Sequence, residues 1–158
     1  MNDAASTEVE SILDKAMATE MISVEQLKRI VRALPHAQVV LLDVRTGEEH
    51  DEGVIPGSTL YPCDHDLIDR ENTAPFTADF DNKFDPTQFD ADTRYILICR
   101  TGPRTEIALE RFLDAELQAC ELIGGVNAWR EQGLCLAPPF SAQQMLESPD
   151  SVDHCLSA

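Results

Sequence analysis

The sequence has few basic side chains. It holds 12 Lys and Arg residues against 29 Asp and Glu residues, a net charge of −17 at neutral pH. A surface of that charge repels nucleic-acid phosphates and anionic lipids, so we expect no nucleic acid and no membrane among the partners. Long apolar runs are missing as well, since those at 39–42 and 95–99 are far too short to cross a bilayer. The 158 residues are enough for one domain with a core of its own.

Paired cysteine motifs are also missing. The five cysteines are widely spaced without a C-x-x-C pair, and the four histidines form no zinc pattern with them. The N-terminus shows no basic stretch followed by an apolar one, as a secretion signal would. We therefore expect reduced thiols in a cytoplasmic protein, with no metal and no other cofactor.

Strands and helices are expected to alternate along the chain. The apolar runs 39–44 and 95–99 lack polar alternation, which is typical of strands covered on both faces. An amphipathic stretch at 24–34 precedes the first run, and another follows Cys99. A shorter strand at 120–123 leads into a glycine pair and a short helix. This alternation predicts an α/β fold with a mostly parallel sheet and helices on both faces.

The chain divides into three parts. Residues 1–21 predict an N-terminal helical extension, with a helix over Thr7–Ala18 that begins at a capping box on Thr7. Residues 22–136 form the main domain, whose first helix Ser23 caps. Residues 137–158 are expected to be a C-terminal tail.

Residues 64–92 differ in composition from the rest of the main domain. They hold nine acidic residues, two basic residues and four of the six phenylalanines. We expect an elaborated connection that is anchored to the domain by its phenylalanines while its carboxylates stay in water. The alternative is a solvated loop without a functional role. The four phenylalanines are Phe76, Phe80, Phe84 and Phe89.

Cys99 is the candidate nucleophile. It ends a predicted buried strand, and in open parallel sheets ligands bind at the carboxyl ends of strands. In the loop that follows, Arg100-Thr101-Gly102-Pro103-Arg104, the glycine allows a tight curl and the proline suits the first turn of a helix. Such a loop directs backbone N–H groups inward and so stabilises a thiolate at its centre. The alternative is that Cys99 is a small buried residue that merely finishes the strand.

Four motifs along the chain resemble those of a single-domain rhodanese, and together they cover roughly residues 22–136. They are Asp43-Val44-Arg45 with Glu49, Gly53-Val54-Ile55-Pro56-Gly57-Ser58, Cys99-Arg100-Thr101-Gly102-Pro103-Arg104, and Leu122-Ile123-Gly124-Gly125-Val126-Asn127-Ala128-Trp129. The resemblance implies a five-stranded parallel sheet and a six-residue active-site loop. It also implies that Cys99 accepts a sulfane sulfur and holds it as a persulfide.

Sulfur transfer is the reaction that this resemblance implies. The Cys99 thiolate would attack the outer sulfur of an anionic donor such as thiosulfate, and cyanide or a thiol would then take that sulfur. Arg100 and Arg104 are candidates for donor binding. A solvated arginine is the alternative, expected more for Arg100 than for Arg104. A sulfur-carrier protein or a thioredoxin-like protein is a further candidate partner.

Other residues of these motifs are expected to support the site. Asp43 and Arg45 would hold the loop and pair with Glu49, and a direct catalytic role is the alternative for them. Cys63 follows the strand after Ile55-Pro56-Gly57, in a place that family members bring near the mouth of the active site. It is either a bystander thiol or a second thiol that attacks the Cys99 persulfide, releasing sulfide and forming a disulfide.

Two other functions compete with sulfur transfer. Certain dual-specificity phosphatases have a similar fold, but they need an arginine six positions after the cysteine to grip phosphate. Here the sixth position is Thr105 and the arginine comes fifth, so the loop favours sulfur transfer. The other alternative is a non-enzymatic rhodanese-like module that binds partners through residues 7–18 or 64–92, with Cys99 as a redox sensor.

Overall fold

The computed structural model describes residues 3–36 and 38–139. A five-stranded sheet runs through it in the order β1-β5-β4-β2-β3, and all neighbouring strands are parallel. The α/β prediction with a five-stranded parallel sheet is therefore confirmed. The strands are β1 (Met21–Ile22), β2 (Val39–Asp43), β3 (Ser58–Leu60), β4 (Arg94–Ile98) and β5 (Gln118–Leu122). The helices are α1 (Asp3–Thr19), α2 (Val24–Arg32), α3 (Gly47–Asp51), α4 (Ala74–Lys83), the 3-10 turn η1 (Pro86–Gln88), α5 (Pro103–Asp114) and α6 (Gly125–Glu131).

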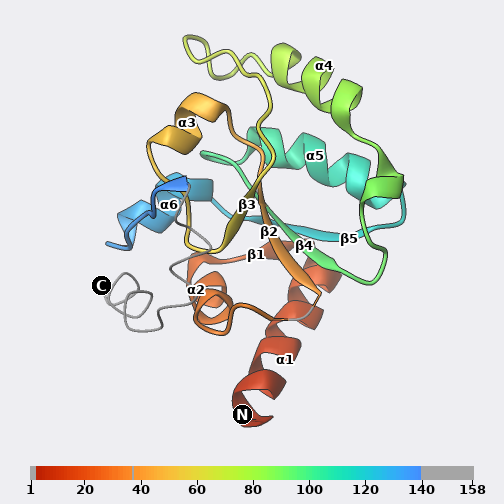
Figure 1. The fold of residues 1–158 in the computed structure, drawn as a ribbon, viewed down its shortest axis with the longest axis vertical. Helices are drawn as coiled ribbons and strands as arrows, with labels where there is room; N and C mark the ends of the chain where they lie inside the picture. The colour runs from red at the N-terminus through yellow and green to blue at the C-terminus, as the bar shows by residue number, and fades with distance from the viewer. Residues whose placement is uncertain (1–2, 37, 140–158) are drawn as a thin grey trace.

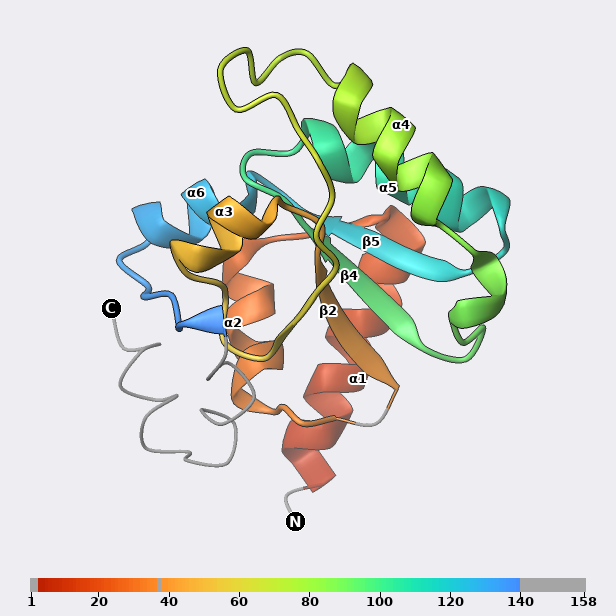
Figure 2. The same ribbon diagram turned by 45° about the horizontal axis from the view of Figure 1, so that its top comes forward.

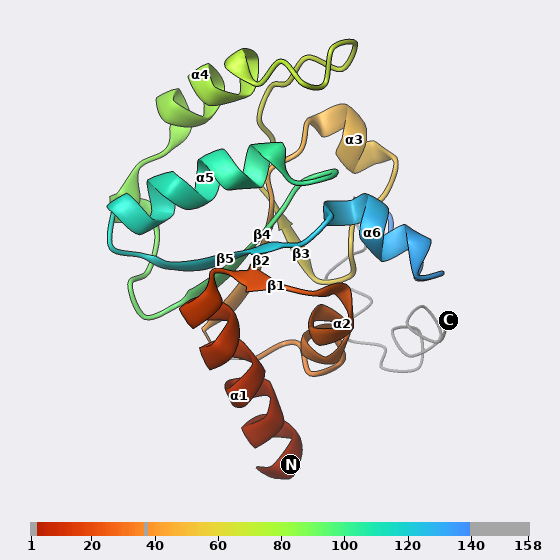
Figure 3. The same cartoon turned by 180° about the vertical axis from the view of Figure 1, so that it is seen from behind.

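The helices form layers on the two faces of the sheet. Helices α1 and α2 cover one face, and α4 and α5 lie on the other (Figure 1). The view from behind shows the same separation (Figure 3). Helices α3 and α6 lie near each other to one side of the sheet (Figure 2). Covering both faces explains why the central strands are uninterrupted apolar runs.

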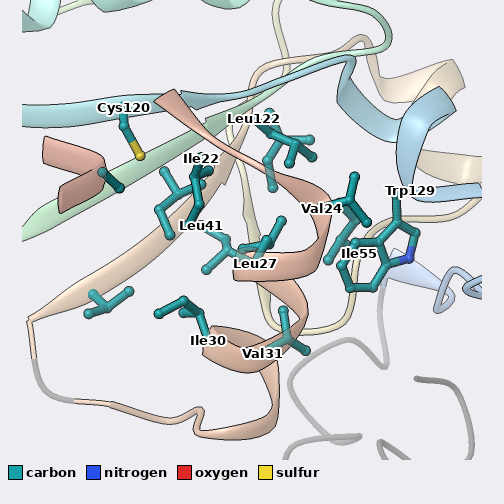
Figure 4. Close-up of a cluster of buried hydrophobic side chains, with 14 of the residues drawn as sticks. Ile22, Val24, Leu27, Ile30, Val31, Leu41, Ile55, Cys120, Leu122 and Trp129 are labelled. Atoms are coloured by element: carbon teal, nitrogen blue, oxygen red, sulfur yellow. The ribbon is translucent and has the colours of Figure 1, made fainter. Parts of the chain in front are cut away.

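The core beneath α2 joins this helix to the sheet and to α6. Figure 4 shows Leu27 and Ile30 of α2 among side chains of the strands, with Trp129 of α6 at one end of the cluster. The capping box predicted at Ser23 is present: the Gln26 N–H donates to Ser23 Oγ at 3.1 Å, and the Ser23 N–H donates to Gln26 Oε1 at 3.0 Å. Local sequence and tertiary packing agree on where this helix begins.

Helix α1 begins earlier than the sequence predicts. It starts at Asp3, so Thr7 lies inside the helix and the predicted capping box at Thr7 is wrong. Its apolar stripe, including Val9, Leu13 and Ala16, is buried in the same core as α2. The apolar face of this helix is therefore occupied by the domain itself.

The acidic connection at residues 64–92 carries α4 and packs its phenylalanines on the opposite face of the sheet. Phe76 and Phe80 are fully buried, and their rings lie 5.5 Å apart between centroids. Phe84 and Phe89 are partly buried against the same cluster, which includes Phe112 of α5. The predicted anchoring by four phenylalanines is confirmed, and the alternative of a merely solvated loop is wrong for this segment.

Three further findings concern membrane-spanning helices, the last described residues and one cysteine. None of the helices in the described ranges is long and apolar enough to span a membrane. Ala137 pairs with Val54 through two backbone hydrogen bonds of 2.7 and 2.8 Å, while the tail from residue 140 onward lies outside the described residues. Cys135 is disulfide-bonded, so the expectation of reduced thiols is wrong at this position.

We expect the Phe80→Ala variant to be less stable than the wild type by about 3–5 kcal/mol, because it leaves a cavity among stacked rings. The free energy of unfolding, measured by urea denaturation, checks this. Ile68→Ala, at a fully exposed position of the same segment, is the control and should change stability by less than about 0.5 kcal/mol. Equal losses in the two variants would contradict the anchoring role.

Candidate active site

The site lies where β2 and β4 end side by side. The two strands are adjacent and in register, with Asp43 opposite Ile98. The Val44 N–H donates to the Ile98 carbonyl at 2.9 Å, which carries the pairing one residue beyond the strands. Cys99 and the Asp43-Val44-Arg45 motif are therefore neighbours, although more than 50 residues separate them in the sequence.

The loop after β4 closes around the sulfur of Cys99. The Gly102 N–H donates to Cys99 Sγ at 3.1 Å, and Thr105 Oγ1 lies 3.6 Å from the same sulfur. The Thr105 hydroxyl also donates to the Gly102 carbonyl at 2.9 Å, which ties the start of α5 back to the loop. Cys99 is fully buried in this arrangement. The sequence predicts several backbone N–H groups directed inward, and among the described residues that of Gly102 is the one that donates to the sulfur.

Two glycines are needed here for different reasons. Gly102 has a φ of +139°, a conformation that favours glycine, while none of the described atoms would crowd a side chain there. At Gly125 an added Cβ would overlap the backbone carbonyls of Cys99 and Arg100. Next to it, the Val126 N–H donates to the Cys99 carbonyl at 2.9 Å, and the following N–H donates to the Arg100 carbonyl at 3.0 Å. The start of α6 therefore holds the start of the loop, and only glycine allows that approach.

Arg104 forms a buried ion pair with Glu49 of α3. Its two terminal nitrogens donate to the two oxygens of the carboxylate at 2.6 and 2.9 Å, and both side chains are at most 4% exposed. Burial raises the pKa of Glu49, but the hydrogen bonds and the charge of Arg104 outweigh it and lower the pKa to about 2. Arg70 adds a third contact to this carboxylate at 3.1 Å. The pair fastens the loop to α3 and leaves Arg104 little capacity for a further anion.

Arg100, unlike Arg104, has no carboxylate partner in the described part of the chain. It is half-buried, and it forms no ion pair within residues 3–36 and 38–139. In this arrangement Arg100, more than Arg104, is available to a donor. The sequence favours Arg104 over Arg100 for donor binding, and these environments favour the opposite order.

Asp43 and Arg45 form a second buried pair beneath the loop. Arg45 Nη2 donates to Asp43 Oδ2 at 2.9 Å. The atom of Glu49 to which Arg45 donates is the backbone carbonyl oxygen, at 3.3 Å, and not the carboxylate. The predicted contact of Arg45 with Glu49 is thus made to the backbone, while Arg104 occupies the carboxylate. His50 Nε2 lies 3.1 Å from Asp43 Oδ1. Burial raises the pKa of Asp43, but hydrogen bonds from His50 and Arg45 outweigh it and lower the pKa.

Cys63 is a buried thiol that donates to the Tyr61 carbonyl at 3.3 Å. Burial raises its pKa to about 12, so it is protonated at neutral pH and a weak nucleophile. This environment favours the bystander interpretation of Cys63 over a second reacting thiol.

The described residues include no cluster of His, Cys, Asp or Glu side chains that could hold a metal ion.

Sequence reasoning missed several contacts of the site. It did not identify Arg104 as the partner of the Glu49 carboxylate, and it gave no role to Arg70, His50 or the hydroxyl of Thr105. These contacts join distant segments, such as residues 49 and 104, and a single sequence carries no periodicity or spacing that reveals them. Thr105 alone had a local signal, because its hydroxyl lies three residues beyond Gly102 on the first turn of α5.

The fold and this loop together define a class of protein. Residues 23–132 match the family model of the rhodanese-like domain. The chain therefore belongs to the rhodanese-like domain family.

A curated relative matches most of the chain. The chain is 22% identical over 113 residues to the adenylyltransferase and sulfurtransferase UBA4 of Debaryomyces hansenii, a match that covers 70% of this chain. The chain spans only about a quarter of that relative, of which 23% is covered.

Solved structures share the fold. A rhodanese-like domain protein from Staphylococcus aureus is 28% identical with a TM-score of 0.51, covering 74% of this chain and 97% of that one. A rhodanese-related protein from Thermoplasma volcanium is 22% identical with a TM-score of 0.56, covering 74% and 96%. A Rhodopseudomonas palustris protein of unknown function, described as a possible tyrosine phosphatase, is 23% identical with a TM-score of 0.56, covering 82% and 93%. At these identities the last two show the fold alone.

The Glu49→Gln variant should be less stable than the wild type by about 3 kcal/mol at pH 7, because Arg104 loses its buried partner. The folded pKa of about 2 lies below the ordinary value of 4.5, so the contribution of Glu49 is fully present above pH 4.5 and is lost as the pH falls toward 2. Urea unfolding of both proteins between pH 7 and pH 3 should show the difference in stability shrinking below pH 4.5. A difference that stays constant over that range would contradict the assignment.

Proposed function

We propose that this protein is a sulfurtransferase that carries sulfane sulfur on Cys99. The observation that carries the proposal is the Gly102 N–H directed at Cys99 Sγ, at 3.1 Å, in a loop at the carboxyl end of β4. The same bond that stabilises a thiolate can stabilise a persulfide anion, so both states of the cysteine suit this loop. Membership of the rhodanese-like family and the distant sulfurtransferase relative support it.

The first half-reaction loads the cysteine. The Cys99 thiolate attacks the outer sulfur of an anionic donor such as thiosulfate, and a new S–S bond forms. The S–S bond of thiosulfate breaks, and sulfite leaves with its electron pair. Arg100, which has no ion pair among the described residues, is the arginine that we assign to the incoming anion.

The second half-reaction returns the cysteine. A nucleophile such as cyanide or a thiolate attacks the outer sulfur of the persulfide, and the S–S bond breaks toward Cys99. The product is thiocyanate or an acceptor persulfide, and the Cys99 thiolate is restored. Two separate half-reactions predict ping-pong kinetics. A sulfur-carrier or thioredoxin-like acceptor protein and a cytoplasmic location stay predictions.

The non-enzymatic module is less well supported. One of its proposed docking elements was the α1 helix, whose apolar stripe packs into the domain core. The phenylalanines of the acidic segment are likewise buried or partly buried in the cluster that they form with α5 and the strands. What remains exposed on both elements is mainly polar, which provides little for a hydrophobic docking contact.

We expect thiosulfate treatment to add the mass of one sulfur atom to the wild-type protein and to Cys63→Ser, but not to Cys99→Ser. Intact-mass spectrometry under non-reducing conditions measures this directly. The Cys63 variant is the matched control, because it removes a buried thiol with a pKa raised to about 12. Failure of several sulfane donors to modify the wild type would overturn the sulfurtransferase proposal and favour the module.

Arg100→Ala is expected to raise the KM for thiosulfate about tenfold, because one charge-assisted contact to the donor is lost. Steady-state transfer to cyanide gives this constant. Arg111→Ala is the control, since Arg111 is paired with Asp81 at 2.9 Å between α5 and α4. If the two variants have the same KM, Arg100 does not bind the donor.

A further inference from the structure

A small polar hollow lies beside the active-site loop. Its volume is about 170 Å³, and it opens between α3, the start of α6 and the loop that carries Arg70. Four of the nine arginines of the chain line it, together with two carboxylates. The charged residues of the lining are Arg45, Arg70, Arg100, Arg130, Glu49 and Glu52.

The charges around this hollow do not cancel. Asp43 neutralises Arg45, and Arg104 neutralises Glu49, each through a buried ion pair. Arg70 shares the Glu49 carboxylate with Arg104, so the remaining positive charge of Arg70, Arg100 and Arg130 faces the single carboxylate of Glu52. Among the described residues neither Arg100 nor Arg130 forms an ion pair, although the protein as a whole has a net charge of −17. An acidic protein that gathers unpaired guanidinium groups in one hollow presents a site for an anion.

The position of the hollow sets the shape of its ligand. Arg100 links the two places, because its side chain lines the hollow while the preceding residue carries the reacting sulfur. Cys99 itself is absent from the lining and is fully buried. A ligand that places an anionic group in the hollow and a sulfur at Cys99 must therefore keep the two groups apart, whereas the charge of thiosulfate lies next to its outer sulfur.

We propose that this hollow binds the carboxylate of a thiol that accepts sulfur from Cys99. The inference rests on the proposed function and specifies the substrate class of its second half-reaction. A volume of about 170 Å³ suits one carboxylate-bearing fragment, since pockets for larger organic ligands usually exceed about 300 Å³. Arg130 and Arg70 hold the carboxylate, while the thiolate attacks the outer sulfur of the persulfide. The new S–S bond forms on the acceptor, and the electron pair of the broken bond returns to Cys99.

The test compares a charged with a neutral acceptor. Protein loaded with thiosulfate is given 3-mercaptopropionate or 2-mercaptoethanol, and the KM for each thiol is measured in the wild type and in Arg130→Ala. We expect the wild type to favour the carboxylate thiol, and the ratio of the two KM values to shift about tenfold toward the neutral thiol in the variant. Arg29→Ala, which removes an exposed arginine of α2, is the control and should leave the ratio unchanged.

A second measurement does not depend on sulfur transfer. Cys99 is alkylated with 3-bromopropionate or 3-bromopropionamide, so that an S–C bond forms and bromide leaves. The wild type should react faster with the charged reagent, and Arg130→Ala should lose that preference. If the wild type, Arg130→Ala and Arg29→Ala all show the same preference between the carboxylate and the neutral reagent in both measurements, the inference is overturned. In that case, continued sulfur transfer to cyanide would leave the proposed function intact. Failure to form any Cys99 persulfide, by contrast, would overturn the proposed function.

Discussion

The buried ion pair between Arg104 and Glu49 is the interaction on which the geometry of the site depends. It joins the first turn of α5 to α3, and so connects the loop after β4 with the segment after β2. A charge pair this deep is stable only when both partners are present with good geometry, which two short hydrogen bonds provide. The pair accounts for the depressed pKa of Glu49, and it commits the second arginine of the loop to a carboxylate of the protein itself.

Charge is distributed unevenly over this protein. The chain as a whole is strongly acidic, yet Arg100 and Arg130, which form no ion pair in the described part of the chain, line one hollow beside the active-site loop. At physiological ionic strength, interactions between exposed charges are screened beyond about 8 Å, so the local arginines dominate what an approaching anion experiences. The acidic surface and an anionic substrate are therefore compatible.

The acidic connection shows how a charged segment can still contribute to a core. Its phenylalanines turn inward onto α5 and the sheet, while its carboxylates stay in water or pair with residues such as Arg111 and Lys83. The residue types alone predict this division, because four phenylalanines in so short a stretch are costly to expose. They do not indicate that part of the segment forms α4, since the hydrophobic spacing there is too sparse to separate a helix from an anchored loop.

The sequence alone determined the alternation of strands and helices, the parallel sheet and the loop that begins at Cys99. These follow from local signals: uninterrupted apolar runs, a capping box, and glycine and proline at the turn into α5. Only the tertiary structure decided which arginine is buried, which carboxylate it meets and where the unpaired arginines gather. Those choices depend on contacts between residues as far apart as 49 and 104, and such contacts exist only after the strands have aligned. The start of α1 at Asp3, four residues before Thr7, is a further feature that the capping pattern at Thr7 did not predict.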